Sequence, residues 1–322
     1  MNKKHEKSSC CSAPIRLFGA RRRQCVSCKR TWRVWPKKQG RKRVRLNVKS
    51  LFEYFGGTLK NKRLKKRTLS AHLRSLLGKF NSNTPWPPVP EENLIVIADG
   101  LIQFFKKEKY TIYFILVRSI TGSRAFILPP YMRKGEEATL GWHEAFAQIP
   151  NDVFVRIKAL VCDGHTGLVY LAKANYWVLQ RCQFHLLARV AHNASFGPLG
   201  KNKGIGLKVK NLMELVLYHK NSTVILLAIE ALRKIKKGIS SRNFKTVISG
   251  FTRHYEDYRS YLNFPEYNLP TTSNTAESLN ALIRNLQYRA KGFNTPKSLF
   301  AWIEGFCKYK KSITCNPKNQ PN

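Results

Sequence analysis

Two aspartates each follow a run of residues with the composition of a buried β-strand. Residues 94–98 (Leu-Ile-Val-Ile-Ala) lead directly to Asp99, residues 153–162 lead to Asp163, and a glycine follows each aspartate. Apolar runs rich in β-branched residues favour strands that are covered on both faces, and the glycine favours a turn. The pattern therefore predicts two strands that each end in a carboxylate.

These two carboxylates indicate a metal site, because aspartate is scarce in the chain. The only aspartates are Asp99, Asp152, Asp163 and Asp257, so half of them lie at the ends of these two runs. Hard oxygen ligands delivered by different strands favour Mg²⁺ or Mn²⁺. Taken singly, each residue has the alternative role of a turn aspartate that caps the next segment.

The composition indicates a folded protein with a polyanionic partner. The chain has 322 residues, 43% of them hydrophobic, and its 58 lysines and arginines exceed its 18 acidic residues to give a net charge of +40. This excess favours nucleic acid as the partner, with an anionic membrane surface as the alternative. No apolar stretch reaches the ~20 residues that a membrane-spanning helix needs, and residues 1–5 lack the apolar part of a secretion signal. We therefore expect a cytoplasmic, DNA-associated protein.

Four of the eight cysteines lie in the first 28 residues, with spacing typical of zinc ligands rather than of disulfides. Cys25 and Cys28 form a C-x-x-C knuckle whose two thiolates can bind one tetrahedral Zn²⁺. Cys11 and the adjacent Cys10 stand where a regular zinc ribbon has a second C-x-x-C, so Cys10 or His5 must be the fourth ligand. Reduced thiols without metal in a small basic arm are the alternative.

Residues 46–84 have the outline of a helix-turn-helix. Apolar residues recur at helical spacing in 48–55 and again in 68–80. The second helix, capped by Thr68 or Ser70, follows a basic run and is thereby suited to contact DNA phosphates. The alternative is a helical hairpin with a basic face that reads no bases.

The order of elements from residue 91 onward is that of a ribonuclease-H-like fold. After the strand that ends in Asp99 we expect two strands, a helix, the strand that ends in Asp163, a further strand and a helix. These elements fall at residues 110–117, 124–128, 136–148, 153–162, 177–182 and 184–194. In that fold the first and fourth strands are neighbours, which would bring the two aspartates together.

The chain is therefore predicted to be an α/β protein in five parts. A proline-rich connector at residues 81–90 separates the amino-terminal segments from the first strand, and basic helical residues interrupt the core later. The parts are a zinc-ribbon-like basic segment, a helix-turn-helix, the first part of a ribonuclease-H-like catalytic core, a helical insertion and the final part of the core, at residues 1–45, 46–84, 91–196, 197–266 and 267–322.

Glu277 is a candidate third acid. It lies in the first turns of a helix that follows Thr271-Thr272-Ser273-Asn274, where several residues can act as helix caps. Alone, it would be explained as an acid that complements the helix dipole. Among the acids after Asp163, however, it is the one framed by small polar residues that permit close approach of a substrate.

These residues resemble the DDE transposases of the Mutator-like superfamily, including its bacterial insertion-sequence branch. The resemblance spans nearly the whole chain. Asp99 in Ala-Asp-Gly, Asp163 in Cys-Asp-Gly-His and Glu277 in Thr-Ser-Asn-Thr-Ala-Glu-Ser-Leu-Asn match the two aspartates and the glutamate of that family. Cys182-Gln-Phe-His185 matches its C-x-x-H signature, which is the most specific of these motifs.

The resemblance implies a mechanism and partners. Asp99, Asp163 and Glu277 would hold two Mg²⁺ ions about 3.5 to 4 Å apart, and attack by water would expose a 3′-hydroxyl that then attacks target DNA. The partners would be terminal inverted repeats and a target duplex, bound by a homodimer or a higher homo-oligomer. Cys182 and His185 would support the metal ligands from behind or position DNA. We do not expect them to bind zinc, because no nearby C-x-x-C or H-x-x-x-H completes a tetrahedron.

Two other functions fit the same sequence. A decayed transposase would keep the fold and bind DNA as a regulator without turnover. A ribonuclease-H-like nuclease would cleave DNA and join nothing. The presence of all three acids argues against decay.

Overall fold

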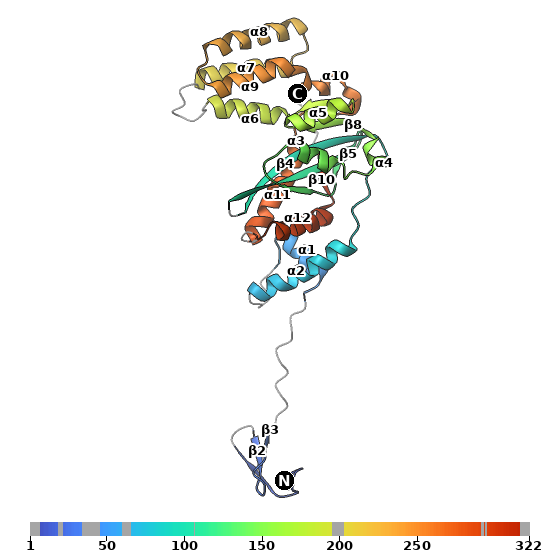
Figure 1. The fold of residues 1–322 in the computed structure, drawn as a ribbon, viewed down its shortest axis with the longest axis vertical. Coiled ribbons are helices and arrows are strands. Elements are labelled where there is room, and N and C mark those ends of the chain that lie inside the picture. The colour runs from blue at the N-terminus through green and yellow to red at the C-terminus, as the bar shows by residue number, and fades with distance from the viewer. Residues whose placement is uncertain are drawn as a thin grey trace.

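A mixed β-sheet with helices on both faces is the centre of the fold (Figure 1). The computed structural model describes residues 7–18, 22–33, 46–59, 66–105, 107–194, 203–290, 293 and 295–315. The strand order is β10-β6-β5-β4-β8-β9, with β7 paired to β5. The strands are β4 (Leu94–Phe105), β5 (Glu108–Ser119), β6 (Arg124–Ile127), β7 (Tyr131–Lys134), β8 (Ile157–Cys162), β9 (Val178–Arg181) and β10 (Ser312–Thr314).

Strand β4 is buried on both faces, as its apolar run predicted. Ile95 and Ile97 pack into the apolar cluster that the carboxyl-terminal helices cover, whereas Val96 and Ala98 pack into the cluster on the opposite face. The strand pairs antiparallel with β5 and parallel with β8. The predicted neighbourhood of the two strands that carry the aspartates is therefore confirmed.

The predicted turn after Asp99 is wrong. β4 continues to Phe105, because its antiparallel pairing with β5 extends through Asp99 and on to the end of the hairpin. The parallel pairing with β8 ends at Ile97, so Asp99 lies just beyond it on the same strand. The corresponding turn after Asp163 does occur, and Gly164 there has a φ of 94°, a conformation that favours glycine.

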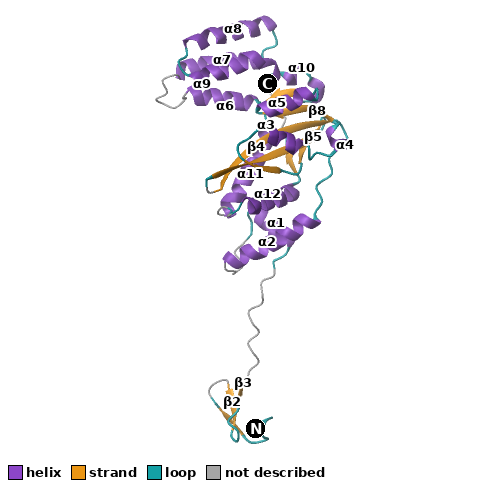
Figure 2. Ribbon diagram, in the orientation of Figure 1, coloured by secondary structure: helices purple, strands orange, loops and turns teal. Residues whose placement is uncertain are grey.

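Two pairs of helices cover the two faces of the sheet (Figure 2). α3 (Thr139–Phe146) and α5 (Thr166–Ala174) cover one face, and α11 (Asn274–Ala290) and α12 (Pro296–Lys310) cover the other. The helix predicted at residues 136–148 is thus shorter than expected. Strands β7 and β10 were not predicted, since three or four residues carry too little periodicity. The strand predicted at residues 153–162 is wrong at its start, because the single turn α4 (Asn151–Phe154) lies there and β8 begins at Ile157.

Four helices form a third apolar cluster that lies outside the sheet, at the top of Figure 1. They are α6 (Gln183–Ala194), α7 (Lys203–Tyr218), α8 (Ser222–Gly238) and α9 (Arg242–His254). The short helices η1 (Tyr255–Tyr258), α10 (Ser260–Asn263) and η2 (Pro265–Tyr267) lead back toward the sheet. The chain enters and leaves this bundle at adjacent points, because the Gln183 amide donates to the Thr271 carbonyl at 2.9 Å.

Helices α1 (Val48–Gly56) and α2 (Lys66–Asn83) share a core with α12. Phe55 and Leu77 belong to the same apolar cluster as Trp302. Asn81 Nδ2 also donates to the Ala301 carbonyl at 2.9 Å. α2 begins at Lys66, so the predicted caps at Thr68 and Ser70 are wrong, because the helix already includes both residues.

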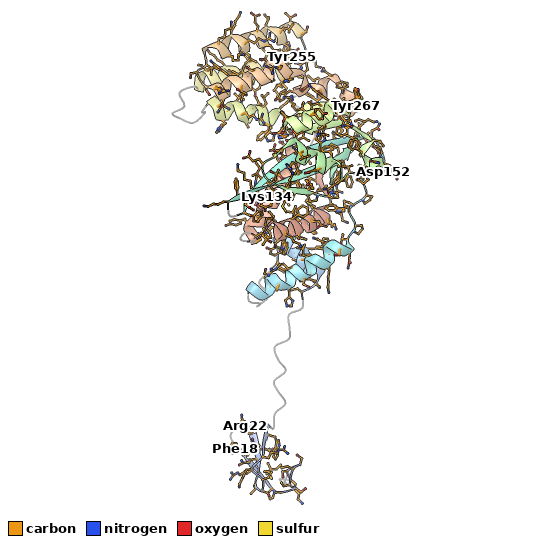
Figure 3. The ribbon with its side chains drawn as sticks, in the orientation of Figure 1. Phe18, Arg22, Lys134, Asp152, Tyr255 and Tyr267 are labelled. Atoms are coloured by element: carbon orange, nitrogen blue, oxygen red, sulfur yellow. The ribbon has the colours of Figure 1, made fainter. Side chains whose placement is uncertain are left out.

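The amino-terminal residues form a small antiparallel sheet of β1 (Ile15–Leu17), β2 (Arg22–Cys25) and β3 (Thr31–Arg33). Phe18, directly after β1, and Arg22, the first residue of the central strand β2, have exposed side chains (Figure 3). Within the part of the chain that the structure describes, no helix is long and apolar enough to cross a membrane.

The contact between α12 and α2 should depend on the missing side chain of Gly305. A Cβ there would lie 2.4 Å from Leu77 Cδ1 and 2.7 Å from Asn81 Oδ1. We expect Gly305→Ala to lower the free energy of unfolding by about 1–3 kcal/mol in urea denaturation. Gly78→Ala in α2, where a Cβ meets nothing within 4 Å, should raise it by about 0.5–1 kcal/mol. Equal effects of the two substitutions would contradict this packing.

Candidate active site

Asp99 and Asp163 face the same side of the sheet. Alternate residues of a strand point to the same face, and each aspartate follows by two positions a residue, Ile97 or Val161, of the cluster that α11 covers. Asp99 is therefore directed toward α11, and Asp163, one residue past the end of β8, lies close enough for its charge to act on Asp99. The two aspartates come from strands that pair directly with each other.

Helix α11 brings Glu277 and Asn280 to these carboxylates. Asn280 is 4% exposed, and its Nδ2 donates to Asp99 Oδ2 at 2.7 Å. Glu277 lies three positions earlier, about one turn away on the same side of the helix. The predicted third acid thus lies beside the two strands that carry the aspartates.

Asp99 lies among like charges. Burial raises the pKa of Asp99 from 3.8 to about 7; the positive charge of His185 opposes this shift, and the negative charges of Asp163, Glu137 and Glu277 add to it. A carboxyl group in this setting keeps its proton near neutral pH unless a cation compensates the charge. The oxygen donors therefore fit a hard divalent cation.

Glu137, directly before α3, is an acid of this site that the sequence did not reveal. A Cβ on Gly100 would lie 2.9 Å from Glu137 Cδ, so the glycine makes room for the carboxylate. Trp142 Nε1 donates to Glu137 Oε1 at 2.8 Å. Burial raises the pKa of Glu137, and the charge of Asp163 adds to that effect. No motif surrounds Glu137, and only the tertiary contact with Gly100 identifies it.

Asp163 is held by its own turn and by an arginine of α6. Its Oδ1 accepts the His165 amide at 2.8 Å, and its Oδ2 lies 3.3 Å from Arg189 Nη2. The Arg189 side chain is 53% exposed, so it can also reach a ligand in solvent. Arg189 was not predicted, although it lies four positions after His185 and thus on the same side of the helix.

Cys182 and His185 lie next to Glu277. The ligand atoms of these three residues are all within 4.8 Å of one another, and His185 Nδ1 is 3.6 Å from Glu277 Oε1. Ser273 joins them, because its amide donates to Cys182 Sγ at 3.3 Å and its Oγ lies 3.4 Å from both His185 Nδ1 and Glu277 Oε1. The C-x-x-H motif therefore contacts the start of the helix that carries Glu277.

This contact changes the protonation of both residues of the motif. Burial raises the pKa of the Cys182 thiol, but hydrogen bonds from His185 and Ser273 outweigh burial and leave the pKa below its ordinary value. The hydrogen bond to Cys182 raises the pKa of His185 to about 9. Without a bound metal, His185 is thus a cation beside the acids.

The four amino-terminal cysteines form a second cluster. Cys10, Cys11, Cys25 and Cys28 lie within 4.8 Å of one another, and Cys10 Sγ is 3.4 Å from Cys28 Sγ. A hydrogen bond from Ser8 Oγ lowers the pKa of Cys25 to about 6. The cluster could hold a metal ion with Cys10 in the fourth position. His5, the other candidate, lies outside the described residues.

These two clusters are the groups of three or more potential metal ligands within 4.8 Å among the described residues. Asp99 and Asp163 belong to neither group. The carboxylates of Asp99 and Asp163 are thus less closely grouped with other potential ligand atoms than the members of these two clusters are with one another.

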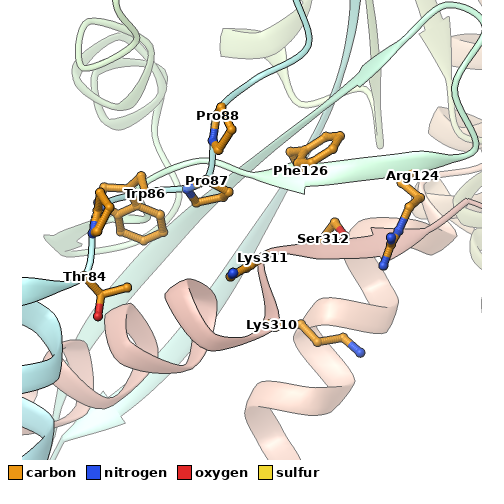
Figure 4. Close-up of a pocket in the computed structure, with 10 residues that line it drawn as sticks. Thr84, Trp86, Pro87, Pro88, Arg124, Phe126, Lys310, Lys311 and Ser312 are labelled. Carbon is orange, nitrogen blue, oxygen red and sulfur yellow. The ribbon is translucent and has the colours of Figure 1, made fainter.

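A pocket of about 440 Å³ lies at the other edge of the sheet, between the connector before β4 and strands β6 and β10 (Figure 4). Trp86 and Phe126 supply aromatic surface, and Arg124, Lys310 and Lys311 supply positive charge. No acid lines this pocket, so its surface suits an anionic partner.

The fold and the site together define a class of protein. A chain of net charge +40 brings the carboxylates of Asp99, Asp163, Glu137 and Glu277 near one another on a mixed sheet. A basic surface can bind a polyanion, and a group of carboxylates can bind divalent cations. The two together are typical of enzymes that act on nucleic acid.

The family model described as Transposase, Mutator family matches residues 111–307, and the chain belongs to this family. The matched region covers more than half of the chain and contains Asp163, Glu277, Cys182 and His185, whereas Asp99 precedes it. Membership confirms the Mutator-like resemblance of the sequence.

Among solved structures, the chain is similar to one from the "Drosophila P element transposase strand transfer complex". The two share 10% sequence identity, with 85% of this chain and 80% of that chain covered, at a TM-score of 0.28. This score is too low to define the fold. No curated protein sequence matches the chain.

The raised pKa of Asp99 should make the metal-free protein less stable as pH rises. The folded protein keeps the Asp99 proton up to a pKa of about 7, whereas the unfolded chain loses it near 3.8. Stability from this group is therefore fully present below pH 3.8 and is lost as pH rises through 7. In EDTA, we expect Asp99→Asn to gain up to about 4 kcal/mol over the wild type between about pH 4 and pH 7 in urea denaturation. A pH-independent difference would contradict it.

Proposed function

We propose that the protein is a DDE transposase that cleaves DNA at the ends of an insertion sequence and transfers the freed strand to target DNA. The observation that carries this proposal is the carboxylate cluster of Asp99, Asp163 and Glu277 beneath α11, in a chain of net charge +40. Family membership supplies the substrate class, since transposases act on DNA.

The acids fit a divalent cation for two structural reasons. Burial and the neighbouring carboxylates disfavour the charged form of Asp99, and a bound cation would favour that charged form again. Asn280 Oδ1 is buried and has no hydrogen-bond partner among the residues that the structure describes, so an oxygen acceptor beside Asp99 remains unused. Asp99, Asp163 and Glu277 would hold Mg²⁺ or Mn²⁺, which polarises the scissile phosphate and acidifies the attacking hydroxyl or water.

The neighbouring side chains orient these acids. Asn280 fixes the Asp99 carboxylate through its amide, and Ser273 and His185 contact the Glu277 carboxylate. Arg189, half exposed and adjacent to Asp163, is placed to bind a DNA phosphate next to the reacting one. In this proposal, Cys182 and His185 support Glu277 from behind and contact no DNA.

The proposal includes a ribonuclease-H-like core, a zinc ribbon and a helix-turn-helix. The parallel pairing of β4 with β8 and the packing of α11 on β4 support a ribonuclease-H-like core at residues 91–196 and 267–322. The helical insertion proposed at 197–266 packs on α6, which ends the first part of the core and shares the apolar cluster of the insertion. The cysteine cluster on a three-stranded sheet supports a zinc ribbon within residues 1–45. The helix pair α1 and α2 supports a helix-turn-helix at 46–84.

DNA is the proposed partner, as terminal inverted repeats and as target duplex. The excess of 58 basic over 18 acidic residues favours phosphate contacts along much of the surface. The basic pocket beside Trp86 would add a further contact to the DNA backbone. Two DNA ends must be joined to one target, which favours a homodimer or a higher homo-oligomer.

Substitution of the acids should separate catalysis from binding. Asp99→Asn, Asp163→Asn and Glu277→Gln should each reduce Mg²⁺-dependent cleavage of DNA carrying the element's ends by at least about 10³-fold, because each removes a proposed metal ligand. DNA binding in gel shifts should change little, because phosphate contacts come from the basic surface.

Asp152→Asn is the matched control, since Asp152 is exposed at the start of α4 and forms an ion pair with Arg156, four positions later (Figure 3). This variant should keep wild-type cleavage. Near-normal cleavage by one of the three site variants would remove that residue from the metal site. Cleavage without strand transfer would favour the nuclease, and binding without cleavage would favour the inactive DNA-binding protein.

The cysteine cluster at the amino terminus should bind zinc. Cys28→Ser should hold about one Zn²⁺ per chain fewer than the wild type, measured by metal analysis after dialysis. Four thiolates close a structural site, and losing one of them should also unfold this small sheet. Cys307→Ala removes a buried thiol outside the cluster and should keep the zinc. Equal zinc in Cys28→Ser and the wild type would show that these residues are plain thiols.

A further inference from the structure

The thiol, imidazole and carboxylate at the start of α6 and α11 have the arrangement of a metal site that differs from the proposed magnesium site. Cys182 Sγ, a His185 ring nitrogen and a Glu277 oxygen lie within 4.8 Å of one another. They come from the end of the β9 region, from the first turn of α6 and from the first turn of α11. We propose that these three residues form a binding site for Zn²⁺, contrary to the expectation from the sequence, and that this site competes with the proposed Mg²⁺ site for Glu277.

The backbone holds the three ligands in place. Cys182 and His185 are three positions apart at the entry to α6, so their side chains lie on one side of the helix start. The hydrogen bond from the Gln183 amide to the Thr271 carbonyl fixes the segment that leads to Glu277. Cys182 is 0% exposed, so its sulfur already lies in a dry, preformed place.

The distances fit tetrahedral coordination. His185 Nδ1 is 3.6 Å from Glu277 Oε1. Bonds of about 2.1 Å at tetrahedral angles place two ligands about 3.4 Å apart, so a small adjustment would close the site. Ser273 Oγ lies 3.4 Å from both of these atoms, so its hydroxyl is close enough to hydrogen-bond a zinc-bound water.

The donor set selects zinc rather than magnesium. Thiolate and imidazole are preferred by Zn²⁺, whereas Mg²⁺ prefers a shell of oxygens. Three protein ligands with one open position are a common zinc arrangement. The site around Asp99 differs, because its potential ligands are carboxylate oxygens.

Glu277 would then be a ligand of two sites, the zinc site and the proposed magnesium site. An ion on the side of Cys182 withdraws Glu277 Oε1 and adds positive charge next to the carboxylates that face β4. Bound zinc therefore weakens the affinity of those carboxylates for Mg²⁺. This consequence rests on the proposed function, whereas zinc binding itself does not.

Metal analysis of the full chain tests the binding. After dialysis against Zn²⁺ and removal of loosely bound ion, Cys182→Ala should hold about one Zn²⁺ per chain fewer than the wild type, also when Cys28→Ser is present in both proteins. The Cys28→Ser protein loaded with Co²⁺ should show thiolate-to-cobalt absorption that Cys182→Ala abolishes. Cys307→Ala, another buried thiol, should keep both signals.

His185→Gln gives a second route to the same answer, since circular dichroism identifies a variant that fails to fold. Equal zinc content in the wild type and in two folded variants, Cys182→Ala and His185→Gln, would overturn the site. Glu277→Gln should weaken zinc binding, whereas Asp99→Asn should leave it unchanged. Unchanged zinc affinity in Glu277→Gln would remove the shared ligand and with it the competition.

The competition is measured on DNA cleavage. Saturating Zn²⁺ should raise the Mg²⁺ concentration for half-maximal cleavage on the order of tenfold, also in the Cys28→Ser protein. No shift would overturn the competition. If no protein cleaves DNA, the proposed function is refuted, and the zinc content still decides whether the zinc site exists. If the Cys28→Ser protein binds no zinc but keeps Mg²⁺-dependent cleavage, the zinc site alone is refuted.

Discussion

Parallel pairing between β4 and β8 is the constraint on which the rest of the structure depends. Because side chains alternate along a strand, this pairing sends Asp99 and Asp163 to the same face of the sheet. That face must then be covered, and α11 covers it with apolar residues while placing Glu277 and Asn280 over the aspartates. The long detour of the chain between β9 and α11 leaves this arrangement intact.

Covering the aspartates creates a conflict between folding and charge. Asp99 loses water and lies beside other carboxylates, which disfavours its ionised form. The Asn280 amide donates a hydrogen bond to Asp99, Arg189 pairs with Asp163, and the charge of His185 offsets part of the repulsion at Asp99. The remaining imbalance is typical of functional sites, where stability is given up for a group held ready to bind a cation.

The sequence predicted the elements that have a strong local signal. The buried strand before Asp99, its neighbour before Asp163 and the helix of Glu277 are all present. The turn after Asp99 was wrong, because a glycine also occurs where another side chain must approach, and here that side chain is Glu137. Glu137 itself carries no local pattern, since only tertiary packing brings it to Gly100.

The hydrogen bond between Gln183 and Thr271 lies where the chain passes from the sheet into the four-helix bundle and back. Because the chain enters and leaves the four-helix bundle at a single stem, the bundle closes a loop whose ends are fixed whatever its length. Helix α6 carries His185 and Arg189 and is therefore tied to the site, whereas α7, α8 and α9 contribute none of the site residues. These three outer helices can thus change in length without moving Asp163 relative to Glu277.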